Sequence, residues 1–109
     1  MVTVTLKNDA LNSFGEYTGE YKQSSFLSEP CFIQNAGFNA IWYDNKNKRW
    51  IIGSVSDIGS GCGNIYTERT VDSFGGLTDD RHIWYYSCGN KWKEIPPDDI
   101  KIAFMMPCK

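Results

Sequence analysis

Turn-forming residues interrupt this sequence roughly every 8–12 positions, which leaves room only for short structural elements. Residues 2–6 alternate apolar and polar side chains, as a strand with one buried face does. Little of the chain shows the 3.6-residue period of an amphipathic helix, and residues 8–12 resemble a turn. The pattern predicts an all-β fold, either an antiparallel sandwich or a small barrel of about eight short strands.

Two of the predicted hairpins have similar sequences, since residues 41–50 and 83–92 both begin Ile-Trp-Tyr and both end in Trp. The similarity indicates a weak internal duplication or two solutions to the same packing problem. In the first hairpin, pairing of Tyr43 with Trp50 would place Ile41 beside Ile52. Both faces are apolar, so we expect this hairpin to be central and covered on both sides. The face opposite Ile41 would carry Phe38, Ala40, Trp42, Ile51 and Val55.

The second hairpin has one mixed face. A two-residue turn at 89–90 would pair Tyr85 with Glu94 and position 87 with Trp92. Large rings then stand beside polar groups that suit a dry core poorly. We therefore predict that Tyr85 and Trp92 are ligand-binding platforms and that Glu94 is a polar contact, unless the rings are simply half-buried sheet residues. The opposite face would carry Trp84, Tyr86 and Ile95.

The length of 109 residues predicts a single domain, 1–109, and the cysteines suggest its environment. There are four cysteines and one histidine, with no C-x-x-C pair and no zinc-type ligand spacing. We interpret the cysteines as two disulfides, rather than as four free buried thiols of a cytosolic protein, and this implies an extracellular protein, secreted or on the cell surface. Four cysteines allow three connectivities. The pairing we favour is Cys62–Cys88, from the glycine-rich loop to the second hairpin, with Cys31–Cys108 anchoring the C-terminus.

Charge and hydropathy argue against several partners. The net charge of −2 does not favour nucleic acid or an anionic membrane surface. No apolar run approaches the roughly 18 residues of a membrane span, and the N-terminal residues lack an apolar signal core. We expect no cofactor and no metal, because Lys46 and Lys48 would repel a cation from the loop at 44–48. The acidic pairs at 79–80 and 98–99 are expected to be solvated.

Two other classes of function compete with binding. A small secreted hydrolase could use His82 with Glu68 or Glu16, although a lone histidine at a strand start is more often a surface group. No nucleophile motif of the G-x-S-x-G type is present, so we do not expect an enzyme. A protease inhibitor could present the loop at 56–64. We favour a binding module for a carbohydrate, as in a lectin, or for a protein, as in cell adhesion.

Several short aromatic motifs occur in a fixed order over residues 15–95. They are Gly-Glu-Tyr, Pro-Cys-Phe at 30–32, Ala-Ile-Trp-Tyr-Asp at 40–44 with Arg-Trp-Ile-Ile-Gly at 49–53, Ile-Tyr at 65–66, and Ile-Trp-Tyr-Tyr at 83–86. This order resembles that of small β modules that recur, often in tandem, in extracellular proteins of invertebrates and some protists. The resemblance implies a disulfide-stapled module for adhesion or recognition, without catalytic residues. The segment 72–80 departs from it, because such modules have proline-rich loops before the late tryptophan.

Overall fold

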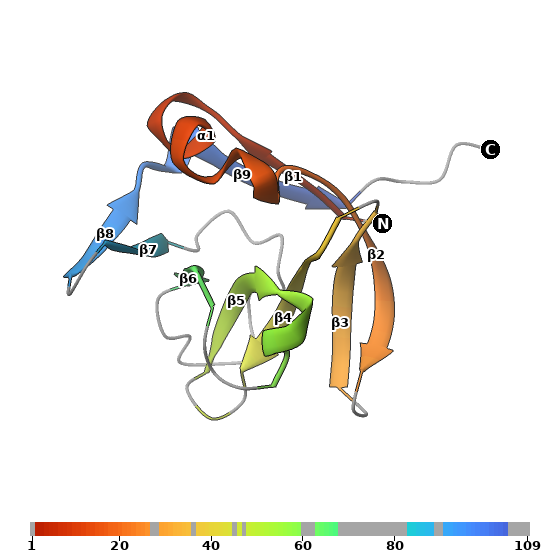
Figure 1. Cartoon of the computed structure of the whole chain (residues 1–109). Helices are drawn as coiled ribbons and strands as arrows, with labels where there is room; N and C mark the ends of the chain where they lie inside the picture. The colour runs from red at the N-terminus through yellow and green to blue at the C-terminus, as the bar shows by residue number, and fades with distance from the viewer. Residues whose placement is uncertain are drawn as a thin grey trace.

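The computed structural model describes residues 2–26, 29–35, 37–44, 46, 48–59, 63–67, 83–88 and 91–104, without the side chains of 25, 26, 29, 30, 87, 88 and 104. The described residues form nine strands in one antiparallel sheet that curls into a nearly closed barrel (Figure 1). The strands are β1 (Val2–Leu6), β2 (Gly19–Phe26), β3 (Glu29–Gln34), β4 (Asn39–Asp44), β5 (Arg49–Ser54), β6 (Ile65–Thr67), β7 (Trp84–Cys88), β8 (Lys91–Ile95) and β9 (Ile100–Phe104). The helices are α1 (Asn8–Phe14) and the 3-10 turns η1 (Gly15–Tyr17), η2 (Val55–Asp57) and η3 (Pro97–Asp99).

The sheet is an up-and-down meander with one exception. From β1 to β8 each strand pairs with the next in sequence, and β9 pairs with β1, so the order is β8-β7-β6-β5-β4-β3-β2-β1-β9. The ends of the sheet, β8 and β9, approach each other through η3 without pairing. The predicted all-β fold is confirmed, in its barrel form and with nine described strands rather than about eight.

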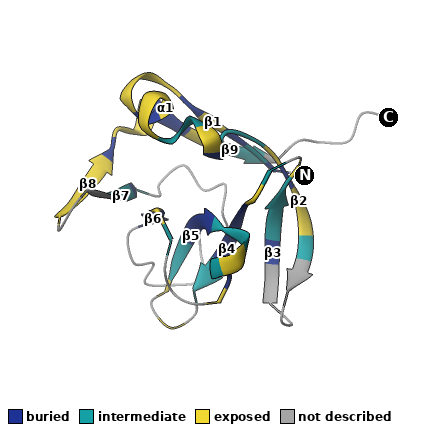
Figure 2. Cartoon of the chain, in the orientation of Figure 1, coloured by how far each residue is buried: buried dark blue, intermediate teal, exposed yellow. Residues whose placement is uncertain are grey.

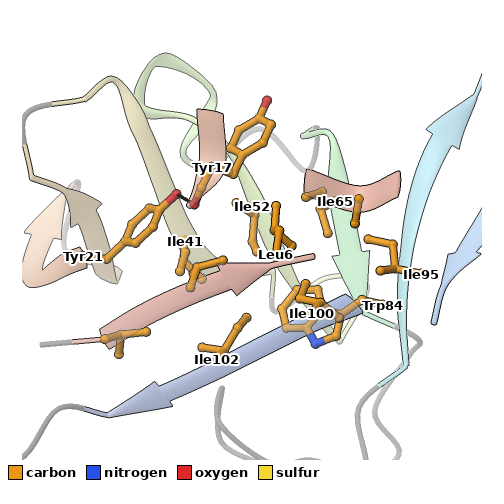
Figure 3. Packing of buried hydrophobic residues seen from close by; sticks show 13 residues of the cluster. Leu6, Tyr17, Tyr21, Ile41, Ile52, Ile65, Trp84, Ile95, Ile100 and Ile102 are labelled. Atoms are coloured by element: carbon orange, nitrogen blue, oxygen red, sulfur yellow. Dashed lines mark hydrogen bonds between the residues drawn. The ribbon is translucent and has the colours of Figure 1, made fainter. Parts of the chain in front are cut away.

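The inner face of the barrel holds the larger hydrophobic cluster (Figure 3). Strand β1 contributes Val2, Val4 and Leu6, which confirms their predicted inward orientation. Strand β2 contributes Tyr21, whose hydroxyl donates to the carbonyl of Tyr17 at 2.7 Å. Burial raises the pKa of the Tyr21 phenol well above its ordinary value. The cluster consists of Val2, Val4, Leu6, Ala10, Tyr17, Tyr21, Ile41, Ile52, Ile65, Trp84, Ile95, Ile100 and Ile102.

The first hairpin occupies the middle of the sheet and is buried on both faces, as predicted. Tyr43 pairs with Trp50 and Ile41 with Ile52, in the predicted register. Ile41 and Ile52 belong to the inner cluster. A second cluster covers the outer face and consists of Cys31, Ala40, Trp42, Ile51, Ile58 and Tyr66, with Ile33 and Val55 beside it.

Phe38 is a correction to the predicted outer face. Its side chain is 86% exposed, because it precedes the start of β4 and lies outside the paired register. Its carbonyl accepts a hydrogen bond from the amide of Val55 at 2.8 Å. Residues 24–30 have the polar, proline-containing composition from which a loop is predicted, and that prediction is wrong, since β2 continues to Phe26 and β3 begins at Glu29.

Helix α1 replaces the turn expected at residues 8–12. Seven residues are too few to display a helical period, and tertiary contacts hold the segment instead. Ala10 faces the core, and Phe14 at its end contacts the Tyr86 ring edge-on at 4.9 Å. The side chain of Asn8 donates to the carboxylate of Asp99 at 2.8 Å. Asp99 is therefore buried rather than solvated, while its neighbour Asp98 is exposed as expected.

The two similar hairpins present their matching residues on opposite faces. Trp42 lies in the outer cluster, whereas Trp84, at the matching position of the second hairpin, lies in the inner cluster. Trp50 packs against the inner cluster, whereas Trp92 contacts the outer-cluster residue Tyr66. In every pairing from β4 to β8, odd-numbered residues of one strand lie opposite even-numbered residues of the next. The inward-facing residues are therefore odd-numbered in one strand and even-numbered in its neighbour. Three pairings separate β4 from β7, so the inward-facing residues of β4 are odd-numbered, such as Ile41, whereas those of β7 are even-numbered, such as Trp84.

Candidate binding face

Strands β7 and β8 have the predicted register. Tyr85 pairs with Glu94 and position 87 with Trp92, while Trp84 pairs with Ile95. Trp84 and Ile95 are buried in the inner cluster, so Tyr85, Trp92 and Glu94 belong to the outer face. Trp92 is 54% exposed, Glu94 is exposed, and Tyr85 is half-buried. The three predicted ligand-binding residues thus share one solvent-accessible face, which we call the Trp92 face.

Tyr66 of β6 supports Trp92. Its ring meets the Trp92 ring edge-on, with centroids 4.7 Å apart and planes at 85°. The hydroxyl of Tyr66 accepts a hydrogen bond from the amide of Gly63 at 2.6 Å, which fixes the ring from the far end. Tyr66 is itself buried, so it acts as a support and leaves the exposed area to Trp92.

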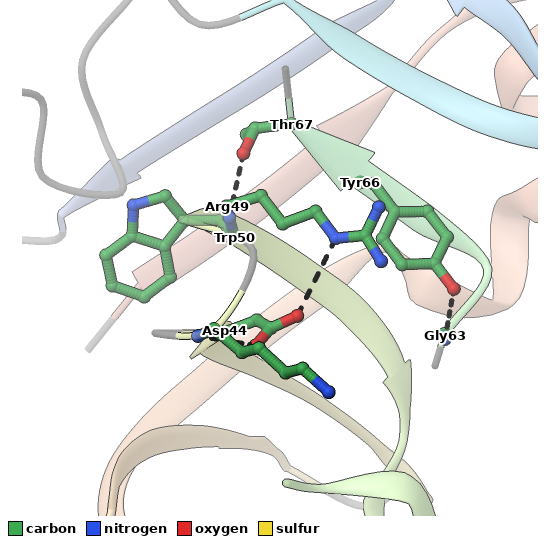
Figure 4. A network of polar contacts seen from close by, with 7 residues as sticks. Asp44, Arg49, Trp50, Gly63, Tyr66 and Thr67 are labelled. Carbon is green, nitrogen blue, oxygen red and sulfur yellow. Dashed lines mark hydrogen bonds and ion pairs between the residues drawn. The ribbon is translucent and has the colours of Figure 1, made fainter. Parts of the chain in front are cut away.

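Arg49 and Asp44 extend this face beyond Tyr66 (Figure 4). The guanidinium carbon of Arg49 lies 4.1 Å from the centroid of the Tyr66 ring, a cation–π arrangement. Its Nε lies 3.8 Å from Oδ2 of Asp44, and the two side chains are 26% and 10% exposed. Asp44 is fixed in turn, because its Oδ1 accepts from the amide of Lys46 at 3.1 Å. The charges of Arg49 and Asp44 offset each other beside an aromatic surface.

Sequence reasoning did not identify Tyr66, Arg49 or Asp44 as members of this face. Their membership depends on the pairing of β6 with β5 and β7, which the short strand Ile65–Thr67 does not reveal by itself. The sequence feature that could have placed Tyr66 is the alternation of side chains between the two faces of a strand. Ile65 and Thr67 face inward, so Tyr66 between them has to face outward beside Tyr85.

Several predicted features lie outside the described residues. Among the four cysteines, the structure describes the side chain of Cys31 alone, which is buried, and burial raises the pKa of its thiol. Cys62, Cys108 and the side chain of Cys88 are among those not described, so both disulfides stay predictions. His82 and Glu68, two residues of the hydrolase alternative, also lie outside, as do residues 60–62 of the loop at 56–64 and residues 72–80.

The described residues supply little else for chemistry. Glu16, the alternative carboxylate, is exposed on η1. Among the described side chains, no three His, Cys, Asp or Glu residues gather as a metal site would require. None of the described helices is long and apolar enough to cross a membrane.

Comparisons of the chain with protein-family models, with curated proteins and with solved structures find no match.

Proposed function

We propose that this domain is a recognition module that binds carbohydrate on the Trp92 face, with no enzymatic activity. The observation that supports the proposal best is the exposure of Trp92 together with its support: its side chain is 54% exposed, yet its ring packs edge-on against the buried Tyr66. A large exposed ring on a rigid support is costly to leave in water and loses little freedom when it binds. Both properties favour a contact surface.

The chemistry of the face suits a sugar ring. An aromatic face carries partial negative charge and attracts the weakly positive C–H groups on the apolar face of a pyranose. Glu94 can accept hydrogen bonds from sugar hydroxyls, and the partly exposed Arg49 can donate them. The proposed roles are stacking for Trp92 and Tyr85, and hydrogen bonding for Glu94 and Arg49.

The proposed setting is extracellular, as the even number of cysteines suggests. A secreted or cell-surface module for recognition needs neither cofactor nor metal, and we propose none here. The hydrolase alternative depends on His82 with Glu68 or Glu16, and the protease-inhibitor alternative depends on the loop at 56–64; the Trp92 face favours neither of them.

A glycan-array screen of the folded domain, followed by calorimetric titration of the best-bound glycan, tests this function. We expect Trp92→Ala to weaken binding roughly thirtyfold, since an aromatic anchor commonly contributes about 2 kcal/mol. The matched control is Phe38→Ala, because Phe38 is an exposed ring that precedes β4 beside Val55, at the opposite end of that strand from Asp44. It should leave affinity unchanged. An absence of bound glycans, or equal losses in both variants, would refute the proposal.

A further inference from the structure

The edge of the sheet at β8 is a second feature that can bind, and it does so through backbone groups rather than through the side chains of the Trp92 face. In the sheet order, β8 pairs with β7 only, and no other described strand lies against its other edge. Side chains on both faces of β8 are exposed from Lys91 to Glu94, and only Ile95 is buried (Figure 2). A strand edge of this kind presents backbone donors and acceptors for another strand.

The register identifies the outward backbone groups. Cys88 and Lys91 pair across a two-residue connection, and such a pair exchanges its backbone hydrogen bonds within the hairpin. Hydrogen-bonded pairs alternate with non-hydrogen-bonded pairs along the ladder, so the backbone N–H and C=O groups of Lys93 and Ile95 also point toward β7. Trp92 and Glu94 therefore direct their N–H and C=O groups away from the sheet.

The free edge is short and has a defined end. Pro96 follows Ile95 and carries no N–H, and its carbonyl accepts from the amide of Asp99 at 2.8 Å. The edge thus offers two N–H and two C=O groups, from Trp92 and Glu94. A partner segment of about five extended residues matches this length.

The charges on β8 disfavour a second copy of this chain as the occupant. Three symmetric antiparallel registers could join the outward groups of one β8 to those of another. They place Lys91 opposite Lys93, Lys93 opposite Lys93, or Glu94 opposite Glu94. Like charges directly opposite each other are destabilising in every one of these registers.

The same charges specify a different partner. Lys91 and Lys93 lie on one face of β8 and are exposed, while Trp92 and Glu94 lie on the other. A strand added to this edge would place its alternate side chains opposite the two lysines. We infer that β8 is a docking edge for an extended protein segment with acidic residues at alternate positions and apolar residues between them.

The test uses a blocked hexapeptide of alternating valine and glutamate, titrated to millimolar concentration into the full-length ¹⁵N-labelled chain. We expect amide shifts centred on Trp92 and Glu94. A valine–lysine hexapeptide should bind at least tenfold more weakly. A valine–glutamate peptide with N-methylated alternate amides should not bind, because it lacks the donors of a ladder. Shifts centred elsewhere, or equal binding of the three peptides, would overturn the inference.

Two variants separate the edge from the Trp92 face. Glu94→Pro removes an outward N–H without removing a bond to β7, so it should lose at least tenfold in peptide affinity while Glu94→Ala does not. Reversal of both lysines, K91E with K93E, should transfer the preference to the valine–lysine peptide, and this result tests the inference if Glu94→Pro does not fold.

Trp92→Ala tests glycan binding separately, so either proposal can fail alone. A dimer in sedimentation that Glu94→Pro abolishes would show a second copy to be the occupant and overturn the inference.

Discussion

The hairpins β4–β5 and β7–β8 have similar sequences and opposite orientations in one sheet. Trp42 faces outward and Trp50 inward, whereas Trp84 faces inward and Trp92 outward. The same short aromatic motif therefore occurs in two hairpins without determining which face each ring occupies. The facing depends on the number of pairings between the two strands and on the residue at which each pairing starts.

The hairpins also differ in how far they are covered. Strand β4 is the middle strand of the nine, and η2 with the residue after it places Val55 and Ile58 over the outer face. Strand β8 has one neighbour and exposed side chains over most of its length. The central position makes both tryptophans of the first hairpin structural, while the edge position leaves Trp92 available to solvent.

Truncation of the inward and outward tryptophans of the second hairpin should give the largest contrast. Trp84 is 5% exposed, and we expect Trp84→Ala to lower the free energy of unfolding by about 3–5 kcal/mol. Trp92→Ala should cost less than about 1 kcal/mol, because its ring is half in water already. Urea denaturation of the two variants measures both losses. Similar losses would mean that Trp92 is part of the scaffold, contrary to its proposed binding role.

Removal of the Tyr66 hydroxyl should have an intermediate effect. Tyr66→Phe leaves the amide of Gly63 without its acceptor, which should cost about 1–2 kcal/mol. Tyr86→Phe is the matched control, because Tyr86 lies on the inner face and its ring contact with Phe14 is retained. We expect the control to cost less than about 0.5 kcal/mol. Thermal and urea denaturation compare the two variants. An equal loss of stability would mean that the hydrogen bond of Tyr66 to Gly63 does not stabilise the support beneath Trp92.

The basic residues that precede the closing tryptophans should give the smallest contrast. Arg49→Lys replaces a planar cation over Tyr66 and beside Asp44, so we expect a loss of about 0.5–1 kcal/mol. Lys91 is exposed on the opposite face, and Lys91→Arg should change stability by less than about 0.3 kcal/mol. Denaturation curves at low and high salt measure the difference. If Lys91→Arg lowered the free energy of unfolding as much as Arg49→Lys, the two basic residues would contribute equally to stability, and the contact of Arg49 with Tyr66 and Asp44 would not explain the difference between the hairpins.

Local patterns were sufficient to predict much of the fold. Alternation in residues 2–6 and the turns at the two hairpin tips predicted which residues pair, down to Tyr43 with Trp50 and Tyr85 with Glu94. Helix α1 was not predictable in this way, because Asp99, far away in sequence, holds its first residue. The extension of β2 and β3 toward each other also exceeded what local polarity suggested.

The candidate site was predictable only in part, for a related reason. Tyr85, Trp92 and Glu94 belong to one hairpin, so hairpin register alone placed them on one face. Tyr66 of β6 contacts Trp92 and Arg49 of β5 contacts Tyr66, and both contacts depend on strand pairings that include one across a long connection. Contacts within a hairpin follow from alternation, whereas contacts between hairpins require the sheet order.

The pairing of β1 with β9 has a consequence for how the barrel forms. Every other pair of neighbours in the sheet is consecutive in sequence, but this pair joins Val2 to Phe104 and Leu6 to Ile100. The meander has low contact order and can assemble by successive addition of adjacent strands, whereas the β1–β9 pair carries the loop-closure entropy of nearly the whole chain. We expect β1 to acquire its second neighbour last, after the other strands have brought the two ends of the chain together.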